Sequence, residues 1–410
     1  MNKRVVVTGM GVISSLGNDW GEFSGKLRDQ VSGIRRMHEW DRFADLNTRL
    51  GGPIENFEIP SHYTRKKIRS MGRVSLLATR ASEMALEDSG LLDDSVLGGG
   101  RTGISFGSCS GSTDALVEFA GMLCETDKSI GVNATTYVRM MSHTAPVNIG
   151  VFFGIKGRVY TTSSACTSGS QGIGQAYETI KYGKQDVMLA GGAEELCPTQ
   201  AAVFDTLYAT STLNDEPSTT PRPFDRKRDG LVIGEGAGTL ILEELSHAQA
   251  RGAKIYAEII GYGTNSDGGH ITQPDTKTMQ VAMELSLEDA SLDSAAIGYV
   301  NAHGTATDRG DIAESIATQN LFGSSMPIST LKGNIGHTLG GCGAIESWAT
   351  INMMNENWFA PTLNLVEPDE RCGSLDYIMG SGREINTEFV MSNNFAFGGI
   401  NTSLIFKRWQ

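Results

Sequence analysis

The feature that most constrains the fold is an order of segments that occurs twice along the chain. Residues 4–8 read as a strand that opens the first half, and residues 254–261 read as a strand that opens a second. The other recurring segments are 101–112 with 297–307, the stretch around Cys166 with 327–347, and 186–195 plus 231–245 with 389–406. We therefore predict an α/β protein with two topologically similar halves, 1–253 and 254–410.

Size and composition set the class of protein. A chain of 410 residues exceeds a typical single core, which agrees with two halves. The six cysteines are scattered without a CxxC pair, so we expect reduced thiols and a cytoplasmic protein. We find no run of about 18 apolar residues and expect no membrane association, and we interpret the N-terminal apolar run as a strand and not as a signal. A net charge of −13 argues against nucleic-acid binding.

Several other segments have definite local interpretations. The Pro- and Asp-rich residues 211–230 predict an exposed loop, while 74–88 and 345–354 have the periodicity of core helices. Gly9 and Gly11 follow a strand but lack the third glycine of a dinucleotide-binding motif, so that function is disfavoured. GEGAG at 234–238 indicates a bend or bulge in a strand.

Cys166 lies where an extended run gives way to a helix. Residues 159–162 predict a short buried strand, and the apolar face beyond them predicts a helix that begins close to Cys166 and ends near Gly183. A helix N-terminus favours a thiolate, which attacks carbonyl groups. The other interpretation is a small buried cysteine with a structural role only.

Two histidines of the second half complete a candidate site. His303 follows the apolar pair Tyr299 and Val300 at a strand end, and His337 lies between glycines in the loop before a helix. A single histidine of this kind is usually structural, but a duplicated fold would bring both to Cys166. Zinc-binding spacings are missing, so we favour a metal-free cysteine–histidine site. Cysteine accepts an acyl group and neutral imidazoles stabilise an enolate, which favours decarboxylative carbon–carbon bond formation over hydrolysis.

The densest basic cluster in this acidic chain lies in residues 65–73. Two interpretations are about equally good: a solvated helix face, or a docking patch for an acidic partner that acts on association rate and orientation. The cluster consists of Arg65, Lys66, Lys67, Arg69 and Arg73.

Four motifs together resemble a known enzyme family. SSACTSG, NAHGTAT, LKGNIGHTLGGCGAIES and SNNFAFGGINTSL are similar to the active-site motifs of β-ketoacyl-[acyl carrier protein] synthases I and II, elongating condensing enzymes of the thiolase superfamily. The resemblance extends over essentially the whole chain. It implies a thiolase-like duplicated fold in five α/β/α/β/α layers, a homodimer, and acyl carrier protein as the partner. It also implies no cofactor beyond the carrier's own phosphopantetheine.

The resemblance also implies roles for individual residues. Cys166 matches the acyl-accepting nucleophile, and His303 and His337 match the pair that promotes malonyl decarboxylation. Lys332 matches the lysine that orients this site, with Glu346 as its partner. The remaining matches are the gating Phe397 with Gly398 in its loop, Thr305 and Thr307 at the phosphopantetheine arm, Ser110 at the acyl pocket, Lys66 and Arg69 at the carrier docking site, and Asn301, Glu346 and Asn394 where some relatives hold a monovalent cation. The backbone N–H groups of Cys166 and Phe397 match the oxyanion hole.

The sequence departs from the bacterial pattern at three places. The motif NIGH, which precedes a helix of the second half, is more similar to the corresponding motif of modular polyketide ketosynthases. FAFGG stands where the bacterial enzymes have FGFGG. Ser110 occupies a position at which relatives differ in the depth of the acyl pocket. Chain length therefore stays open. The alternatives are a ketosynthase of a polyketide or specialised lipid pathway, a non-catalytic chain-length partner subunit, and a degradative thiolase. The presence of Cys166 with both histidines disfavours the partner subunit, and the lack of a clear second catalytic cysteine disfavours the thiolase.

Overall fold

One mixed sheet of eleven strands runs through the molecule. The computed structural model describes residues 2–124 and 132–410. The strands follow the order β13-β11-β10-β15-β16-β9-β1-β8-β6-β4-β5. Their bounds are β1 (Val5–Ile13), β4 (Thr102–Gly107), β5 (Val159–Thr162), β6 (Val187–Glu194), β8 (Gly236–Glu244), β9 (Ala257–Ser266), β10 (Ile297–Asn301), β11 (Pro327–Ser329), β13 (Asp376–Tyr377), β15 (Phe389–Ala396) and β16 (Ile400–Arg408).

The sheet consists of two halves with the same topology. In the first half, β5, β4 and β6 are parallel, and β8 and β1 follow antiparallel; in the second, β11, β10 and β15 are parallel, and β16 and β9 follow antiparallel. The halves join where Val5 to Val7 of β1 pair antiparallel with β9. The predicted duplicated α/β fold is confirmed, because equivalent strands occupy equivalent places.

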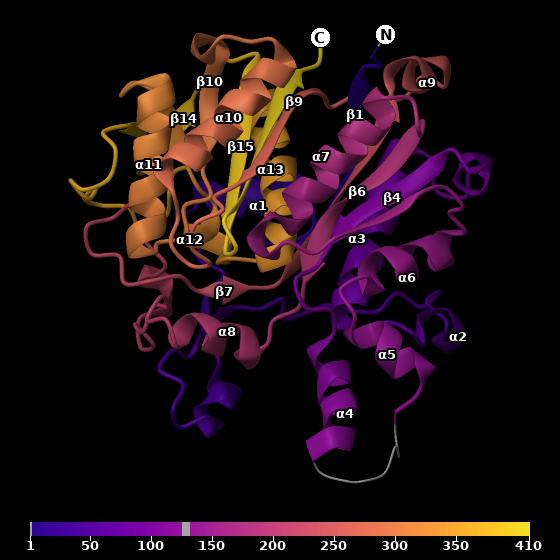
Figure 1. The fold of residues 1–410 in the computed structure, drawn as a ribbon, viewed down its shortest axis with the longest axis horizontal. Coiled ribbons are helices and arrows are strands. Elements are labelled where there is room, and N and C mark those ends of the chain that lie inside the picture. Colours follow the sequence, from indigo (N-terminus) through magenta and orange to yellow (C-terminus); the bar gives the residue numbers. More distant parts are fainter. Residues whose placement is uncertain (1, 125–131) are drawn as a thin grey trace.

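The helices form three layers around the two halves of the sheet. Helices α7 (Ser168–Lys181) and α13 (Cys342–Glu356) each contact strands of both halves, so they make the central layer. On the outer faces, α3 (Arg73–Ser89) and α6 (Thr144–Phe153) cover the first half, and α10 (Thr276–Ala290) with α11 (Asp308–Phe322) covers the second. Figure 1 shows this division, with the first half in indigo to magenta and the second in orange to yellow. The predicted five-layered order is confirmed.

The glycines of β1 allow this close layering. A Cβ atom on Gly9 would lie 2.3 Å from the Ala85 carbonyl oxygen of α3, and one on Gly11 would lie 2.2 Å from the Ala81 oxygen. Gly261 and Gly263 of β9 face α10 in the same way. These positions therefore serve helix–strand contact, which explains why the motif resembles a dinucleotide-binding turn without being one.

Two local predictions need correction. β5 is not buried: Val159 is 45% exposed, because β5 is the edge strand of the sheet. The segment 211–230 is only partly an exposed loop, since Phe224 and Asp225 are buried under residues of the second half. The two predicted core helices are present as α3 and α13, and GEGAG lies at a strand interruption between β7 (Ile233–Gly234) and β8.

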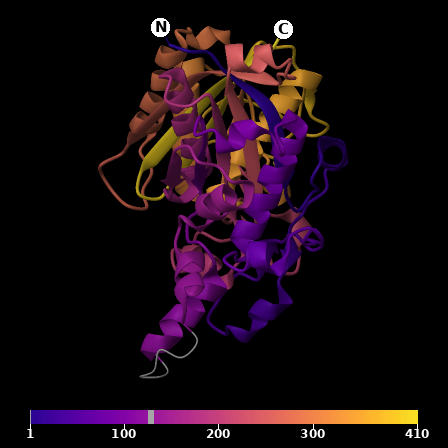
Figure 2. The ribbon, with the colours of Figure 1, turned by 90° about the vertical axis from the view of Figure 1, so that its right-hand side faces the viewer.

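Helices α4 (Thr113–Cys124), α5 (Ala134–Met140) and α8 (Pro198–Asp205) lie at the end of the molecule opposite the termini (Figure 1). There α4 and α5 project from the body, as both ribbon views show (Figure 1, Figure 2). Among the described residues, no helix combines the length and apolar character needed to cross a membrane. The other elements are α1 (Trp20–Arg28), β2 (Arg35–Arg36), η1 (His38–Arg42), β3 (Leu50–Gly52), α2 (Arg65–Ile68), η2 (Ser95–Gly98), η3 (Ala165–Thr167), η4 (Pro217–Thr219), α9 (Leu245–Ala250), η5 (Ser294–Ala296), α12 (Lys332–Ile335), η6 (Leu339–Gly341), β12 (Trp358–Phe359) and β14 (Arg383–Glu384).

Candidate active site

Cys166 lies in a tight turn between β5 and α7. The residue before it, Ala165, has a φ of 50°, which places its backbone in the left-handed region. The turn is held by Ser168, whose hydroxyl accepts from the Ser164 N–H at 3.0 Å and whose carbonyl accepts from the Thr162 hydroxyl at 2.8 Å. The sulfur is thereby presented at the N-terminal end of α7, as the sequence predicts.

The structure brings both predicted histidines to this sulfur. His337 Nε2 lies 2.9 Å from Cys166 Sγ, and the rings of His303 and His337 lie 5.1 Å apart. The backbone N–H of Leu339 donates to His337 Nδ1 at 3.3 Å, so in the neutral ring Nε2 carries the hydrogen. His337 therefore directs a donor toward the cysteine.

Burial favours the neutral form of both imidazoles. Burial lowers the pKa of His303 and of His337 well below the usual value, and the charge of Lys332 lowers both further. A neutral ring keeps one N–H group, which can donate a hydrogen bond to a developing oxyanion. The pair is thus suited to stabilise negative charge on a bound substrate.

Cys166 is a thiol at rest, contrary to our expectation of a favoured thiolate. Burial raises its pKa to about 11, although Lys332 and the backbone N–H groups of Phe397 and Cys166 act in the opposite direction. The loss of water around the sulfur raises the pKa more than the N-terminus of α7 lowers it. The expectation of a thiolate took account of the helix N-terminus but not of this loss of water. The same two N–H groups are those predicted for the oxyanion hole, and both act on the sulfur.

Lys332 and Glu346 form a fully buried ion pair behind the histidines. Asn394 links this pair to the histidines, because its Nδ2 lies 2.7 Å from Glu346 Oε2 and 3.4 Å from His303 Nδ1. Burial raises the pKa of Glu346, and Lys332 opposes that rise. Glu346 therefore acts through Lys332 and Asn394 and does not line the cavity at Cys166.

Sequence reasoning missed two acids that hold the His303 loop. Glu314 of α11 accepts the His303 and Gly304 N–H groups, each at 2.7 Å, and Asp311 accepts the N–H groups of Thr305 and Ala306 at 3.0 and 3.1 Å. Burial raises the pKa of Glu314 to about 8. Asp311 lies in the first turn of the helix that follows the histidine motif, where an acidic residue is a recognisable signal, whereas Glu314 lies further along the helix.

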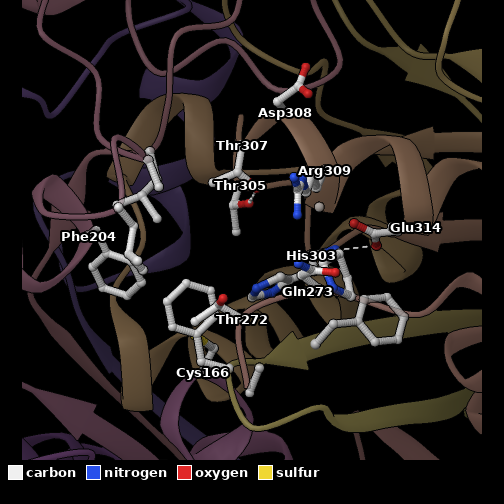
Figure 3. A pocket seen from close by; sticks show the side chains of 18 of the residues that line it. Cys166, Phe204, Thr272, Gln273, His303, Thr305, Thr307, Asp308, Arg309 and Glu314 are labelled. Carbon is white, nitrogen blue, oxygen red and sulfur yellow. Dashed lines mark hydrogen bonds between the residues drawn. The ribbon is translucent and has the colours of Figure 1, made fainter. Parts of the chain in front are cut away.

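A cavity of about 500 Å³ connects Cys166 with the surface. Figure 3 shows Cys166 at one end, His303 next to it, and Thr305, Thr307 and Asp308 progressively farther away. The Thr305 and Thr307 hydroxyls lie 2.9 Å apart on its wall. Both threonines therefore lie on the wall of the route from the surface to Cys166.

Phe397 lies at the turn between β15 and β16 and lines the cavity. Its ring packs on Phe204 with a centroid distance of 5.1 Å. The next residue, Gly398, has a φ of 89°, and its N–H donates to the Ile271 carbonyl at 2.7 Å. Gly398 is exposed but is not part of the cavity wall, so its contribution is to the turn.

Three other predicted residues lie away from the cavity wall. Ser110 accepts a hydrogen bond from Gln200 Nε2 at 3.3 Å and does not line this cavity, so its assignment to the acyl pocket stays a prediction. Lys66 and Arg69 are exposed on and after α2. Among the described residues, neither forms an ion pair, unlike Arg73 of the same cluster, which binds Glu235 at 2.6 Å.

Two groups of atoms are compatible with a cation. The ligand atoms of Cys166, His303 and His337 all lie within 4.8 Å of one another. Separately, the buried side-chain oxygens of Asn301 and Asn394 have no hydrogen-bond partner in the described part of the chain. Amide oxygens are ligands for hard cations, and the predicted monovalent-cation set of Asn301, Glu346 and Asn394 stays a prediction.

Comparison with known proteins identifies the family. The family model "Beta-ketoacyl synthase, N-terminal domain" matches residues 2–248, and "Beta-ketoacyl synthase, C-terminal domain" matches residues 256–366. The chain belongs to the β-ketoacyl synthase family. β-Ketoacyl synthases are condensing acyltransferases, so the protein is an enzyme of this class.

Relatives of the synthase match it over its full length. The 3-oxoacyl-[acyl-carrier-protein] synthase 1 of Haemophilus influenzae is 38% identical over 100% of both chains. A crystal structure of a β-ketoacyl synthase from Burkholderia phymatum is 60% identical over 100% of both chains, with a TM-score of 0.98. A type II polyketide ketosynthase bound to its acyl carrier protein (AntDE:AntF) is 30% identical over 100% of both chains, with a TM-score of 0.86.

Proposed function

We propose that this synthase is a 3-oxoacyl-[acyl carrier protein] synthase that extends a cysteine-bound acyl chain by two carbons from malonyl-[acyl carrier protein]. The observation that carries the proposal is the contact of 2.9 Å between Cys166 Sγ and His337 Nε2, with neutral His303 beside them. A thiol nucleophile with two neutral donors supports acyl transfer followed by enolate formation.

The first half-reaction moves the acyl group to Cys166. The sulfur attacks the thioester carbonyl of the acyl carrier protein, the carbon–sulfur bond to the carrier breaks, and the carrier's thiol leaves with the proton. The N–H groups of Cys166 and Phe397 stabilise the tetrahedral oxyanion. Because the thiol is protonated at rest, the proton must leave the sulfur as the new bond forms.

The second half-reaction forms the carbon–carbon bond. The malonyl carboxylate leaves as carbon dioxide, and its bonding electrons form an enolate whose oxygen accepts hydrogen bonds from His303 and His337. The enolate carbon attacks the acyl-cysteine carbonyl, and Cys166 leaves as a thiolate that takes up one proton. Burial, and to a smaller extent the charge of Lys332, favours neutral imidazoles through this step, because both lower the pKa of His303 and His337.

Acyl carrier protein is the proposed partner for both half-reactions. Lys66 and Arg69 are exposed and lack ion pairs in the described part of the chain, so their charges are available to an acidic surface. In a chain of net charge −13, such a local basic patch can steer an acidic partner toward one face. A type II polyketide ketosynthase of the same fold binds its carrier protein.

A homodimer is proposed on the basis of two unpartnered surfaces. β5 is an edge strand whose free backbone groups can pair with a second copy, and Val159 on it is 45% exposed. Helix α6, which precedes β5 in the chain, exposes Val151 to 76%, and the projecting α4 exposes Val117 to 71%. Apolar surface of this kind is typical of a subunit interface.

The proposed reaction requires no cofactor besides the carrier's phosphopantetheine, since every step uses side chains or backbone N–H groups of the chain. Asn301, Asn394 and Glu346 would hold a monovalent cation, to which the two asparagines would offer the side-chain oxygens that lack a partner in the described part of the chain. All six cysteines are free thiols, which supports the expectation of a cytoplasmic enzyme.

Intact-protein mass spectrometry after incubation with acyl-[acyl carrier protein] tests the proposal. The wild type should gain the mass of one acyl group, and Cys166→Ser should gain none. His303→Ala and His337→Ala should still be acylated but should release carbon dioxide from malonyl-[acyl carrier protein] at least about 100-fold more slowly, the usual scale for loss of an oxyanion donor. Acylation of Cys166→Ser at the wild-type rate would refute the assignment of Cys166 as the nucleophile.

A second candidate is a ketosynthase of a polyketide or specialised lipid pathway. The NIGH motif and the likeness to the carrier-bound polyketide ketosynthase favour it. The catalytic residues are the same in both, so only the acyl donor separates them. A mixture of saturated, unsaturated and polyketide thioesters offered together would show, by the mass of the acylated enzyme, which class is accepted.

A further inference from the structure

Three apolar side chains stand exposed at the mouth of the catalytic cavity. Leu207 is 44% exposed, Tyr208 is 90% exposed and Ile271 is 74% exposed, and all three line the cavity that leads to Cys166. Leu207 and Tyr208 follow α8, and Ile271 lies in the loop after β9. We call these three residues the apolar rim. Exposed apolar surface gathered at an opening marks an interaction site.

Tyr208 is held outward by a backbone conformation that disfavours a large side chain. Its φ of 52° lies in the left-handed region, which a bulky residue seldom adopts without a compensating use. The turn is well fixed, because Tyr208 N–H donates to the Asp205 carbonyl at 2.9 Å and Ala209 N–H donates to the Phe204 carbonyl at 3.0 Å. The buried Asp205 carboxylate also accepts the Thr210 hydroxyl at 2.9 Å. The fold thus maintains an exposed aromatic residue at this position.

We propose that the apolar rim is a contact surface for the body of the acyl carrier protein while its arm is inserted into the cavity. This inference rests on the proposed function. The rim surrounds the route to Cys166, so a carrier that delivers a thioester must lie against it. Exposed tyrosine is typical of residues that dominate binding energy, because a large surface is buried at a small entropic cost.

The mouth also supplies one charge that suits the same partner. Arg309, at the start of α11, lines the cavity, and within the described residues no carboxylate pairs with it. The neighbouring Asp308 is already bound by Arg228 and Arg371. The mouth therefore fits a partner with an apolar spot next to an acidic group.

The decisive experiment compares two substrates that differ only in the carrier protein. Acylation of Cys166 is measured with acyl-[acyl carrier protein] and with the same acyl group on free pantetheine. For Tyr208→Ala, the ratio of the two kcat/KM values, carrier over pantetheine, should fall about tenfold. The matched control is Tyr182→Ala: Tyr182 is 57% exposed at the end of α7 and lies outside the cavity wall, so the ratio should stay at the wild-type value.

Tyr208→Gly separates a contact role from a structural one. Glycine adopts a φ of 52° without strain, and the lost side chain is almost fully exposed, so the unfolding temperature should not fall. The carrier-to-pantetheine ratio should fall as it does for Tyr208→Ala. A fall in unfolding temperature with an unchanged ratio would show that Tyr208 serves the fold.

Two further outcomes would overturn the inference. Equal losses with both substrates would place Tyr208 in contact with the arm or the chemistry, and a change in sedimentation would place it in a contact between copies of the chain. Failure of the proposed function is distinguishable from both, because the wild type would then be acylated by neither substrate.

Discussion

Cys166 is surrounded by groups that act on its charge in opposite directions. Burial raises its pKa to about 11, whereas Lys332 and two backbone N–H groups stabilise the thiolate. Because alkylating reagents react with the thiolate, iodoacetamide labelling of the free enzyme should become about tenfold faster per pH unit between pH 8 and 10. Labelling is followed by intact mass, with Cys166→Ser as the blank. A rate that levels off below pH 8 would contradict a raised pKa.

Lys332 offers an independent check of the same balance. Lys332→Met removes the positive charge that lowers the pKa of Cys166, so labelling at a given pH should become slower than in the wild type. The double variant with Glu346→Gln also removes the opposing carboxylate and should recover part of the rate. An unchanged rate in Lys332→Met would show that the lysine does not act on the sulfur.

Glu194 links two loops of the site and should make stability depend on pH. Its carboxylate accepts the Cys109 N–H at 2.7 Å and the Gly340 N–H at 3.3 Å, and burial raises its pKa to about 7 from 4.5. A raised carboxyl pKa stabilises the fold fully below the unfolded value and loses that contribution as the pH rises through the folded value. The free energy of unfolding should therefore fall by up to about 3 kcal/mol between pH 4.5 and 8.

The Glu194→Gln variant tests that contribution. Glutamine can keep its oxygen toward both backbone N–H groups and its amide toward Ser108, but it cannot ionise. Urea unfolding at pH 5 and pH 8 should show less pH dependence than in the wild type. Glu288→Gln on α10, an exposed position, serves as the control and should leave the difference between the two pH values unchanged.

At the scale of elements, the contact of β1 with α3 depends on glycine. A Cβ atom at position 11 would lie 2.2 Å from the Ala81 carbonyl oxygen, so Gly11→Ala should lower the free energy of unfolding by about 2 kcal/mol or more. Gly25 lies in α1 with open space around it, and Gly25→Ala should raise stability by up to about 1 kcal/mol. Equal effects of the two substitutions in urea unfolding would contradict the close packing.

At the scale of the whole molecule, the edge strand β5 should carry the proposed dimer. A lysine at Val159 places a charge on the exposed edge, which disfavours pairing with a second copy. Val159→Lys should sediment as a monomer at concentrations where the wild type is a dimer. Val366→Lys, at a residue 81% exposed elsewhere in the chain, is the control. A monomeric wild type would remove the dimer from the proposal.

The arrangement of the whole chain was predictable because local patterns repeat in it. The strand ends that carry Cys166, His303 and His337 were evident from apolar runs that stop at glycine, serine or histidine. The duplicated order then implied that equivalent strand ends meet. The position of β5 at the edge of the sheet was not predictable from the same patterns, so β5 was wrongly predicted to be buried. The residue types of β5 reflect its propensity to form a strand, whereas its exposure depends on which strands lie beside it in the sheet.

By itself, the sequence determined the family and the duplicated α/β order, and it singled out Cys166, His303 and His337 as the proposed nucleophile and its two histidine partners. Those properties reside in residue types at fixed spacings. Only the tertiary structure decided that Cys166 rests as a thiol, that Glu194 and Glu314 hold the site's loops, and that Tyr208 stands exposed at its mouth. Each of these three properties depends on how much water surrounds a side chain. The residues that exclude or admit this water are neighbours in space that lie far away in the sequence.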